Sequence, residues 1–352
     1  MTMLSRRILL AALALFILVA AALAAEVRTA HALRLGLHMD MTFSDDQGVN
    51  ARAITLARTV FASISRNSFL WHKIEPERGR RDWSAMDQLL DMLDKAGVEP
   101  LLCVYGSPVW ASGATGNEDQ YWLHVPTDQA RFGVWLEQYK DFMREAAARY
   151  KGRVRKWELW NEQNIGDAWR PRANFAQYVQ WYKAMHAVIR EADPAAEIAL
   201  GGLGNLTFVG EGSMPGYQFL QKLYEAGVYP EIVAIHPYTK VAPDQFKQWD
   251  NNFDDIGLIR RIMESFGQSA RPLWITEWGW SSAEVGEQRQ AMYLKKSLEM
   301  LQSRFRYVSM AIYFLDWDRP PQYHFGLYTT AFVSKPAAFV FAEQAKALGQ
   351  GR

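Results

Sequence analysis

Cysteine, histidine and net charge are all scarce in this sequence, and each shortage excludes a class of function. Cys103 is the only cysteine, so an intrachain disulfide is impossible, and its apolar neighbours predict a buried, inert thiol. The seven histidines are scattered, with no pair at a zinc-ligand spacing, so we predict no metal site. The formal net charge is only +1, which gives no electrostatic footprint for nucleic acid.

Two catalytic motifs are also missing. No glycine-rich dinucleotide fingerprint follows an early strand, which argues against an open doubly wound sheet and against a nucleotide cofactor. No Gly-x-Ser-x-Gly elbow is present, so serine hydrolase chemistry has no support. We therefore expect a function that needs no cofactor.

The composition is that of a packed globular protein, with 49% apolar and 22% charged residues. Aromatic residues are abundant, with 14 Trp and 15 Tyr among 352 residues. This length suits either two average domains or one barrel of eight strand-helix units, which takes about 250 residues or more.

The amino terminus predicts export. Arg6 and Arg7 precede an uninterrupted apolar run of 18 residues, 8–25. That run is longer than the usual signal core of about 7 to 15 residues and close to the minimum of about 17 for a spanning helix. Small-x-small cleavage sites follow at 22–24 and 30–32, so residues 1–32 are either a signal peptide or an N-terminal membrane anchor. Both alternatives place the remainder outside the cytoplasm, as a periplasmic, secreted or membrane-anchored protein.

Strand and helix patterns alternate through the rest of the chain. Eight strand-helix units without a linker predict a single (β/α)8 TIM barrel, an α/β fold, over residues 33–350. The predicted strands are 33–38, 60–66, 100–105, the segment before Glu162, 197–202, 232–236, 273–277 and 308–315. The predicted helices lie near 49–58, 84–96, 132–143, 175–189, 216–226, 256–266, 288–304 and 335–348.

Polar and aromatic residues gather at the ends of these strands, where barrel enzymes place their chemistry. Glu162 and Glu277 each close an apolar run among indoles, so we predict that they face each other. Two opposed carboxyl groups, amides for hydroxyl groups and aromatic rings for sugar faces together suit the cleavage of a glycosidic bond. Glu158, close to this motif, is expected to form a salt bridge on the far side of the barrel.

Three motifs resemble those of retaining glycoside hydrolases of clan A. They are Trp160-Asn161-Glu162, Thr276-Glu277-Trp278-Gly279, and 71–79 followed by Asp82-Trp83. The chain is most similar to family 39, including enzymes encoded with bacterial exopolysaccharide machinery. One departure is Gln163, which stands where clan members commonly have proline.

This resemblance implies a role for several strand-end residues. Glu162 would be the general acid/base and Glu277 the nucleophile. Asn161 would bond the 2-hydroxyl group of the sugar at the cleavage point, and Arg66 would keep the nucleophile ionised. His236 or Tyr238 would contact that nucleophile, and Trp317 would be the floor under the sugar.

For some residues the sequence leaves sugar binding and a structural role equally open: His38, Asp40, Trp110 and Trp280. The aromatic residues along the expected cleft favour an endo-acting enzyme on a polysaccharide, and the resemblance favours β-linkages. Two alternatives remain, a non-catalytic carbohydrate-binding or envelope assembly factor and a transglycosidase. The sequence gives no indication of an oligomeric state.

Overall fold

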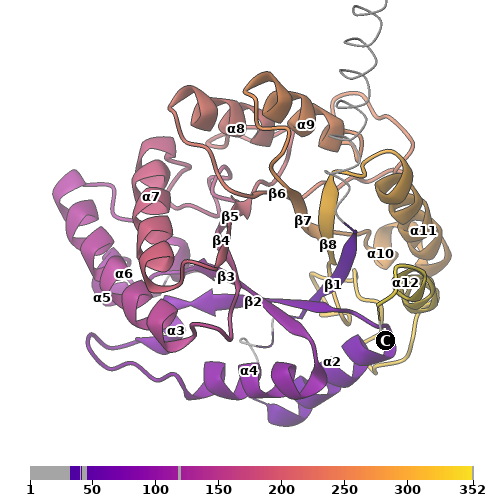
Figure 1. Cartoon of the computed structure of the whole chain (residues 1–352), viewed down its shortest axis with the longest axis horizontal. Coiled ribbons are helices and arrows are strands. Elements are labelled where there is room, and N and C mark those ends of the chain that lie inside the picture. Colours follow the sequence, from indigo (N-terminus) through magenta and orange to yellow (C-terminus); the bar gives the residue numbers. More distant parts are fainter. Residues whose placement is uncertain (1–31, 40, 42–45, 118–119, 351–352) are drawn as a thin grey trace, which may run out of the picture.

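Eight parallel strands form the centre of the molecule, and helices surround them (Figure 1). The structure is a computed structural model that describes residues 32–39, 41, 46–117 and 120–350. The predicted leader, residues 1–32, therefore lies outside the described residues except for its last position, and so does Asp40. Among the residues that are described, no helix combines the length and apolar character needed to cross a bilayer.

The strands follow the predicted order along the chain. Their bounds are β1 Arg34–His38, β2 Ile64–Leu70, β3 Glu99–Tyr105, β4 Lys156–Asn161, β5 Glu197–Gly202, β6 Val233–Ile235, β7 Leu273–Trp278 and β8 Val308–Tyr313. Each strand pairs in parallel with its sequence neighbour, and β1 pairs with β8. Bridges between Ala199 and Ile232 and between Leu203 and Ile235 join β5 to β6 and complete the ring. The predicted (β/α)8 TIM barrel is confirmed.

Long helices follow the strands and form the outer layer. They are α2 Gln47–Thr59, α4 Ser84–Ala96, α6 Gln129–Arg149, α7 Phe175–Ala192, α8 Gly216–Glu225, α9 Asp255–Ser265, α11 Glu287–Ser303 and α12 Pro336–Ala347. Short additional turns lie in the connections: α3 Trp71–Ile74, α5 Val109–Ser112, η2 Tyr121–Leu123 and α10 Ser282–Val285. All eight predicted helices are present, whereas the four short elements were not predicted.

The barrel interior has two layers of different chemistry. The lower layer is a small apolar cluster that contains Ile64, Leu101 and Trp274. Two residues further along the same strands, side chains on the same face are polar: Arg66, Cys103 and Thr276. Side chains alternate between the two faces of a strand, so residues two positions apart point to the same face. The barrel interior therefore changes from an apolar layer at its base to a polar and charged layer beneath the barrel mouth.

Candidate active site

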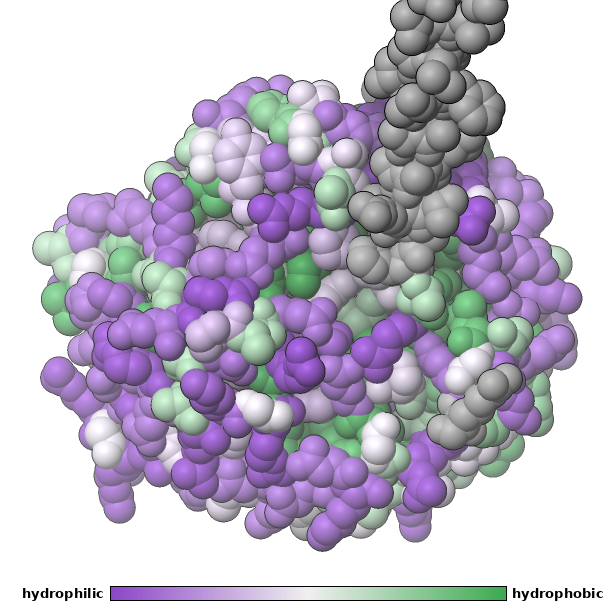
Figure 2. Space-filling model, viewed as in Figure 1, coloured by the Kyte–Doolittle hydropathy of each residue, from purple (hydrophilic) through white to green (hydrophobic). Residues whose placement is uncertain are grey.

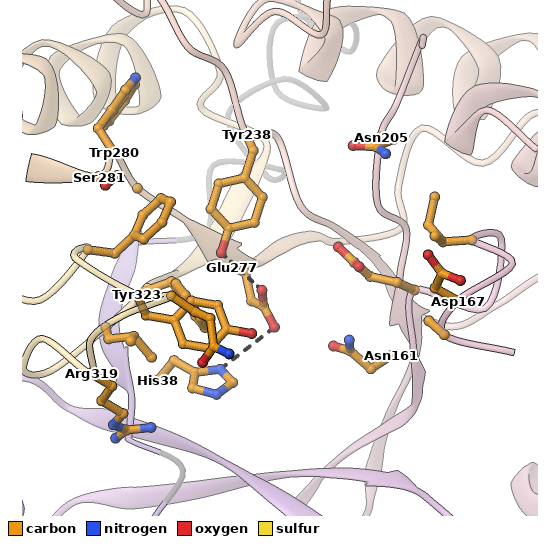
Figure 3. A pocket seen from close by; sticks show the side chains of 18 of the residues that line it. His38, Asn161, Asp167, Asn205, Tyr238, Glu277, Trp280, Ser281, Arg319 and Tyr323 are labelled. Atoms are coloured by element: carbon orange, nitrogen blue, oxygen red, sulfur yellow. Dashed lines mark hydrogen bonds and ion pairs between the residues drawn. The ribbon is translucent and has the colours of Figure 1, made fainter. Parts of the chain in front are cut away.

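The carboxyl ends of the strands surround an open cleft with a cavity volume of about 850 Å³. Hydrophilic side chains predominate on the molecular face shown in Figure 2. Acidic, amide and aromatic groups line the cleft, including Asn161, Glu162, Asn205, Tyr238, Glu277 and Phe314. Figure 3 shows several of them pointing into the same space from different strands. The predicted gathering of polar and aromatic groups at the strand ends is therefore present.

Glu277, in β7, is held as a carboxylate by donors on two sides. Arg66 Nη1 donates to its Oε1 at 2.6 Å. The Tyr238 hydroxyl donates to its Oε2 at 3.0 Å (Figure 3). Burial acts to raise the pKa of Glu277, but the positive charges of His236 and Arg66 outweigh it and lower the pKa to about 2. Glu277 is therefore ionised at any ordinary pH.

Arg66, in β2, is buried at 2% exposure, and its guanidinium group contacts side chains from four other strands, β1, β3, β4 and β7. Its Nε donates to Glu158 Oε2 at 2.6 Å, and its Nη2 donates to Asn161 Oδ1 at 2.7 Å. Because the Asn161 amide oxygen accepts from Arg66, the Asn161 NH₂ group remains as a donor toward the cleft. Arg66 Nη1 also lies 2.7 Å from His38 Nδ1, which must accept because a guanidinium group has only donors.

Glu162 follows β4 and has a more exposed side chain than Glu277, at 29% against 11%. Its Oε1 lies 2.9 Å from His236 Nδ1. On the other side of this ring, His236 Nε2 lies 3.1 Å from Thr276 Oγ1, and that hydroxyl donates to Glu158 Oε1 at 2.7 Å. Since the Thr276 hydrogen is used on Glu158, the hydroxyl accepts from His236, which fixes a proton on Nε2.

His236 Nδ1 and Glu162 Oε1 consequently share one proton position. A neutral His236 accepts the proton of a carboxylic acid, whereas a protonated His236 donates to a carboxylate. Burial acts to lower the pKa of His236, but the charges of Glu277 and Glu162 raise it above the ordinary value for histidine. The fully buried ring thus keeps a proton in contact with Glu162.

The two glutamates are close enough to act on the same carbon atom. One oxygen of Glu162 and one of Glu277 lie within 4.8 Å of each other. Retaining glycosidases separate their carboxyl groups by about 5 to 5.5 Å, and inverting ones by about 6.5 to 9.5 Å. Glu162, Glu277 and His236 are also the one set of possible metal ligands within that distance among the described residues. However, His236 Nδ1 already bonds Glu162, so we interpret this pair as sharing a proton and not as ligands of a metal.

Irregular backbone at the end of β4 aims these groups at the cleft. Trp160 and Glu162 have positive φ angles of 79° and 53°, which are costly for residues with a side chain. The Trp160 ring leaves the barrel and packs against Trp169 and Trp181 in the outer core. The chain can then direct both Asn161 and Glu162 toward the mouth.

Two predicted aromatic residues lie elsewhere. Trp317 does not line the cleft, because its ring packs against Phe332, and Arg319 lies over it 4.5 Å from the ring centroid. Trp110 is also absent from the cleft lining, since its Nε1 donates to the Glu75 carbonyl group and its ring packs against Trp71. The assignment of Trp317 as the sugar floor therefore disagrees with the structure.

Phe314, directly after β8, occupies the wall of the cleft in place of Trp317. Its ring lies 5.0 Å from His38 and 6.1 Å from Tyr238, measured between centroids. Phe325 and Tyr323 extend this wall at 5.6 Å each from Phe314. The run of aromatic residues after β8 could have indicated such a wall, although not which rings face inward.

The position of Glu158 also differs from the predicted one. It is completely buried inside the barrel, where it accepts from Arg66, Thr276 and the backbone N–H of Gly202. The predicted salt bridge exists, but it lies beneath the cleft and not on the far side. Glu158 and Thr276 connect Arg66 to His236, so they link the groups that hold Glu277 to the group that holds Glu162.

Residues 75–349 match the family model "Glycosyl hydrolases family 39". The fold is similar to a family 39 glycoside hydrolase from Bacteroides cellulosilyticus WH2, with 22% identity, a TM-score of 0.66, and coverage of 91% of this chain and 64% of that one.

Two further solved structures are similar. The family 39 enzyme from Xanthomonas axonopodis pv. citri has 20% identity and a TM-score of 0.66, over 89% of this chain and 65% of its own. A monomeric beta-xylosidase from Caulobacter crescentus CB15 has 21% identity and a TM-score of 0.65, over 89% and 67%. This chain thus spans about two thirds of the length of these enzymes.

Proposed function

The chain belongs to glycosyl hydrolase family 39, and from this premise we propose that it is a retaining glycosidase with Glu277 as nucleophile and Glu162 as general acid/base. One observation carries the proposal. A permanently ionised carboxylate and a carboxyl group that shares a proton with His236 face one cleft, with oxygens within 4.8 Å of each other. This pair supplies both groups that a double displacement requires.

In the first step, Glu277 attacks the anomeric carbon and forms an ester bond to the sugar. The bond from that carbon to the leaving oxygen breaks, and its electron pair goes to the oxygen. Glu162 donates a proton to this oxygen, so the leaving group departs as a neutral alcohol. The proton that Glu162 and His236 Nδ1 shared has now left with the alcohol, so Glu162 is a carboxylate that can act as the base in the next step.

In the second step, Glu162 removes a proton from water as the water oxygen attacks the anomeric carbon. The ester bond to Glu277 breaks, and its electron pair returns to the carboxylate. Arg66 and Tyr238 remain bonded to Glu277 and stabilise the charge that reappears. Two displacements at one carbon restore its original configuration.

Asn161 is proposed to bind the 2-hydroxyl group of the sugar at the cleavage point. Its amide oxygen is occupied by Arg66, which leaves the NH₂ group for a sugar oxygen. Phe314 and Tyr238 provide apolar surface next to Glu277, where sugar faces can pack. The same residues exclude water from the nucleophile.

The substrate is proposed to be a β-linked polysaccharide that is cut internally, such as a bacterial exopolysaccharide. The cleft is open, with a volume of about 850 Å³, and its lining includes Trp122 and Tyr323 besides the residues that contact Glu277. His72 stacks on Trp122 at 5.2 Å and fixes its ring beside the cleft. A fixed aromatic ring in the lining, in addition to Phe314 and Tyr238, favours several sugar subsites.

Hydrolysis of a panel of polysaccharides and aryl β-glycosides by the purified protein tests this function. We expect Glu162→Gln and Glu277→Gln each to lose activity by about 10³-fold or more, with folding retained. A protein that binds a polysaccharide from the panel and turns over none of them would be a binding factor. Transfer of the sugar to an added alcohol as the main product would instead identify a transglycosidase.

We also propose that residues 8–25 direct the barrel out of the cytoplasm. The support is the apolar run behind Arg6 and Arg7 and the small residues that follow it. Fusing a periplasm-dependent alkaline phosphatase after residue 350 tests this, because the fusion should be active in cells and lose activity when 1–32 are deleted. An inactive fusion with the leader intact would contradict export.

A further inference from the structure

Two exposed aromatic residues lie against each other outside the catalytic groups. Phe208 belongs to the connection between β5 and α8, and Trp249 to the connection between β6 and α9 (Figure 1). They are 37% and 77% exposed, and their ring centroids are 5.9 Å apart at an interplanar angle of 83°. A Trp with this exposure leaves most of a large apolar face in water, which is unfavourable unless something covers it.

The surrounding loops fix these rings through one amide side chain. Asn251 Oδ1 accepts from the backbone N–H groups of Thr207 at 2.9 Å and Phe208 at 3.1 Å, and Asn251 Nδ2 donates to the Phe208 carbonyl oxygen at 3.0 Å. Trp249 has a φ of 60°, a conformation that disfavours a bulky side chain. Such strain persists only where surrounding contacts enforce it, and it is concentrated at functional positions.

The aromatic pair is continuous with the active-site cleft. Asp250 and Asn251, which directly follow Trp249, both line that cleft, and so does Asn205 near Phe208. The β5 connection also touches the general acid/base, because a Cβ atom at Gly204 would lie 2.6 Å from Glu162 Oε1. Glu162 protonates the leaving oxygen, so the connection that carries Phe208 borders the side of the cleft toward which the leaving group extends.

We propose that Trp249, supported by Phe208, is a sugar-stacking platform for the leaving-group portion of a polysaccharide, beyond the sugars held at the two glutamates. This inference rests on the proposed glycosidase function. The apolar face of a sugar ring would cover the Trp249 indole, and Lys247 and Asp250, joined by a 2.7 Å ion pair, would offer polar groups to its hydroxyls. A short leaving group ends before this platform, whereas a polymer reaches it.

The test compares Trp249→Gly with the wild type on two substrates. One is an activated 2,4-dinitrophenyl β-glycoside, and the other is whichever of β-1,4-xylan, β-1,4-mannan or a mixed-linkage β-glucan the wild type cleaves fastest. Glycine suits the positive φ of this position, so the loop can keep its shape without the ring. Phe339→Ala, which removes a 69% exposed ring on α12, is the matched control, and Trp249→Phe restores an aromatic face.

We expect Trp249→Gly to lower kcat/KM about tenfold on the polysaccharide and to change it less than about twofold on the aryl glycoside. Trp249→Phe should recover most of the loss, and Phe339→Ala should match the wild type. Equal activity of Trp249→Gly and wild type on the polysaccharide would overturn the platform while leaving the glycosidase function intact. Lost binding to phosphatidylethanolamine–phosphatidylglycerol vesicles, with unchanged polysaccharide cleavage, would overturn it in favour of a membrane contact. A wild type inactive on the aryl glycoside and on all three polysaccharides would refute the glycosidase function itself.

Discussion

Removing the Tyr238 hydroxyl group should move the acidic limit of activity. Tyr238 donates to Glu277 Oε2 at 3.0 Å in a buried setting, and Glu277 has a pKa of about 2. A hydrogen bond to a charged group contributes about 1.5 to 3 kcal/mol, and one pKa unit corresponds to about 1.4 kcal/mol. Tyr238→Phe should therefore raise the pKa of Glu277 by about 1 to 2 units.

A higher pKa of Glu277 moves the acidic limit of activity to a higher pH. Glu277 must be ionised to attack, so activity is present above its pKa and is lost as the pH falls through that value. In the wild type, kcat/KM on an aryl glycoside should stay level on the acidic side to about pH 3. In Tyr238→Phe it should begin to fall near pH 4 and be lower throughout, with circular dichroism confirming that the protein remains folded.

Tyr105→Phe is the matched control. Tyr105 lines the same cleft, but its hydroxyl lies 2.8 Å from Ser68 Oγ and not at Glu277. The acidic limit of activity of Tyr105→Phe should equal that of the wild type. If Tyr238→Phe and Tyr105→Phe both give the same acidic limit as the wild type, then Tyr238 does not help to keep the nucleophile ionised.

Other substitutions test the remaining parts of the site. Asn161→Ala should lower kcat/KM about 10- to 100-fold on an ordinary aryl glycoside and have little effect on the 2-deoxy glycoside, which lacks the hydroxyl group; equal losses on both would refute that contact. Gly204→Ala should displace Glu162 and reduce kcat. Gly210→Ala lies on the same connection but has nothing within 4 Å of the added Cβ atom, so it should leave kcat unchanged. Indistinguishable rates in the two variants would show that the packing of Gly204 against Glu162 is unimportant. Glu158→Gln removes the negative charge that faces Arg66 inside the barrel. Chemical denaturation should therefore show a loss of about 3 kcal/mol in the free energy of unfolding. An unchanged free energy of unfolding would contradict a stabilising role for this ion pair.

The strands were predictable because their interiors are apolar and their ends are polar, and this pattern also located Glu162 and Glu277. Boundaries were less certain: β2 begins at Ile64 and not at Val60, since Phe61 has a φ of 58° and interrupts the strand. The short helices α3, α5 and α10 contain only four residues each, too few to produce a helical period.

Side-chain direction was harder to predict than strand position. Trp317 lies close to the end of β8 in sequence, but contacts with Phe332, fifteen positions later, decide where its ring packs. Glu158 was placed on the wrong face because its partners, Arg66 and Thr276, come from strands far away in the sequence. Both errors concern long-range packing, which a local pattern of apolar and polar residues does not record.

Trapping the covalent intermediate tests the role of Glu277 as nucleophile most directly. Incubation with a 2,4-dinitrophenyl 2-deoxy-2-fluoro-β-glycoside should inactivate the protein, because the fluorine slows both oxocarbenium-like steps while the dinitrophenolate leaving group keeps the first step fast, so that the ester accumulates. Mass spectrometry of the digested protein should then find the fluorosugar on the peptide that contains Glu277, and Glu277→Gln should remain unlabelled. A label on any other residue, or turnover of the parent glycoside without a trapped ester, would contradict Glu277 as the nucleophile.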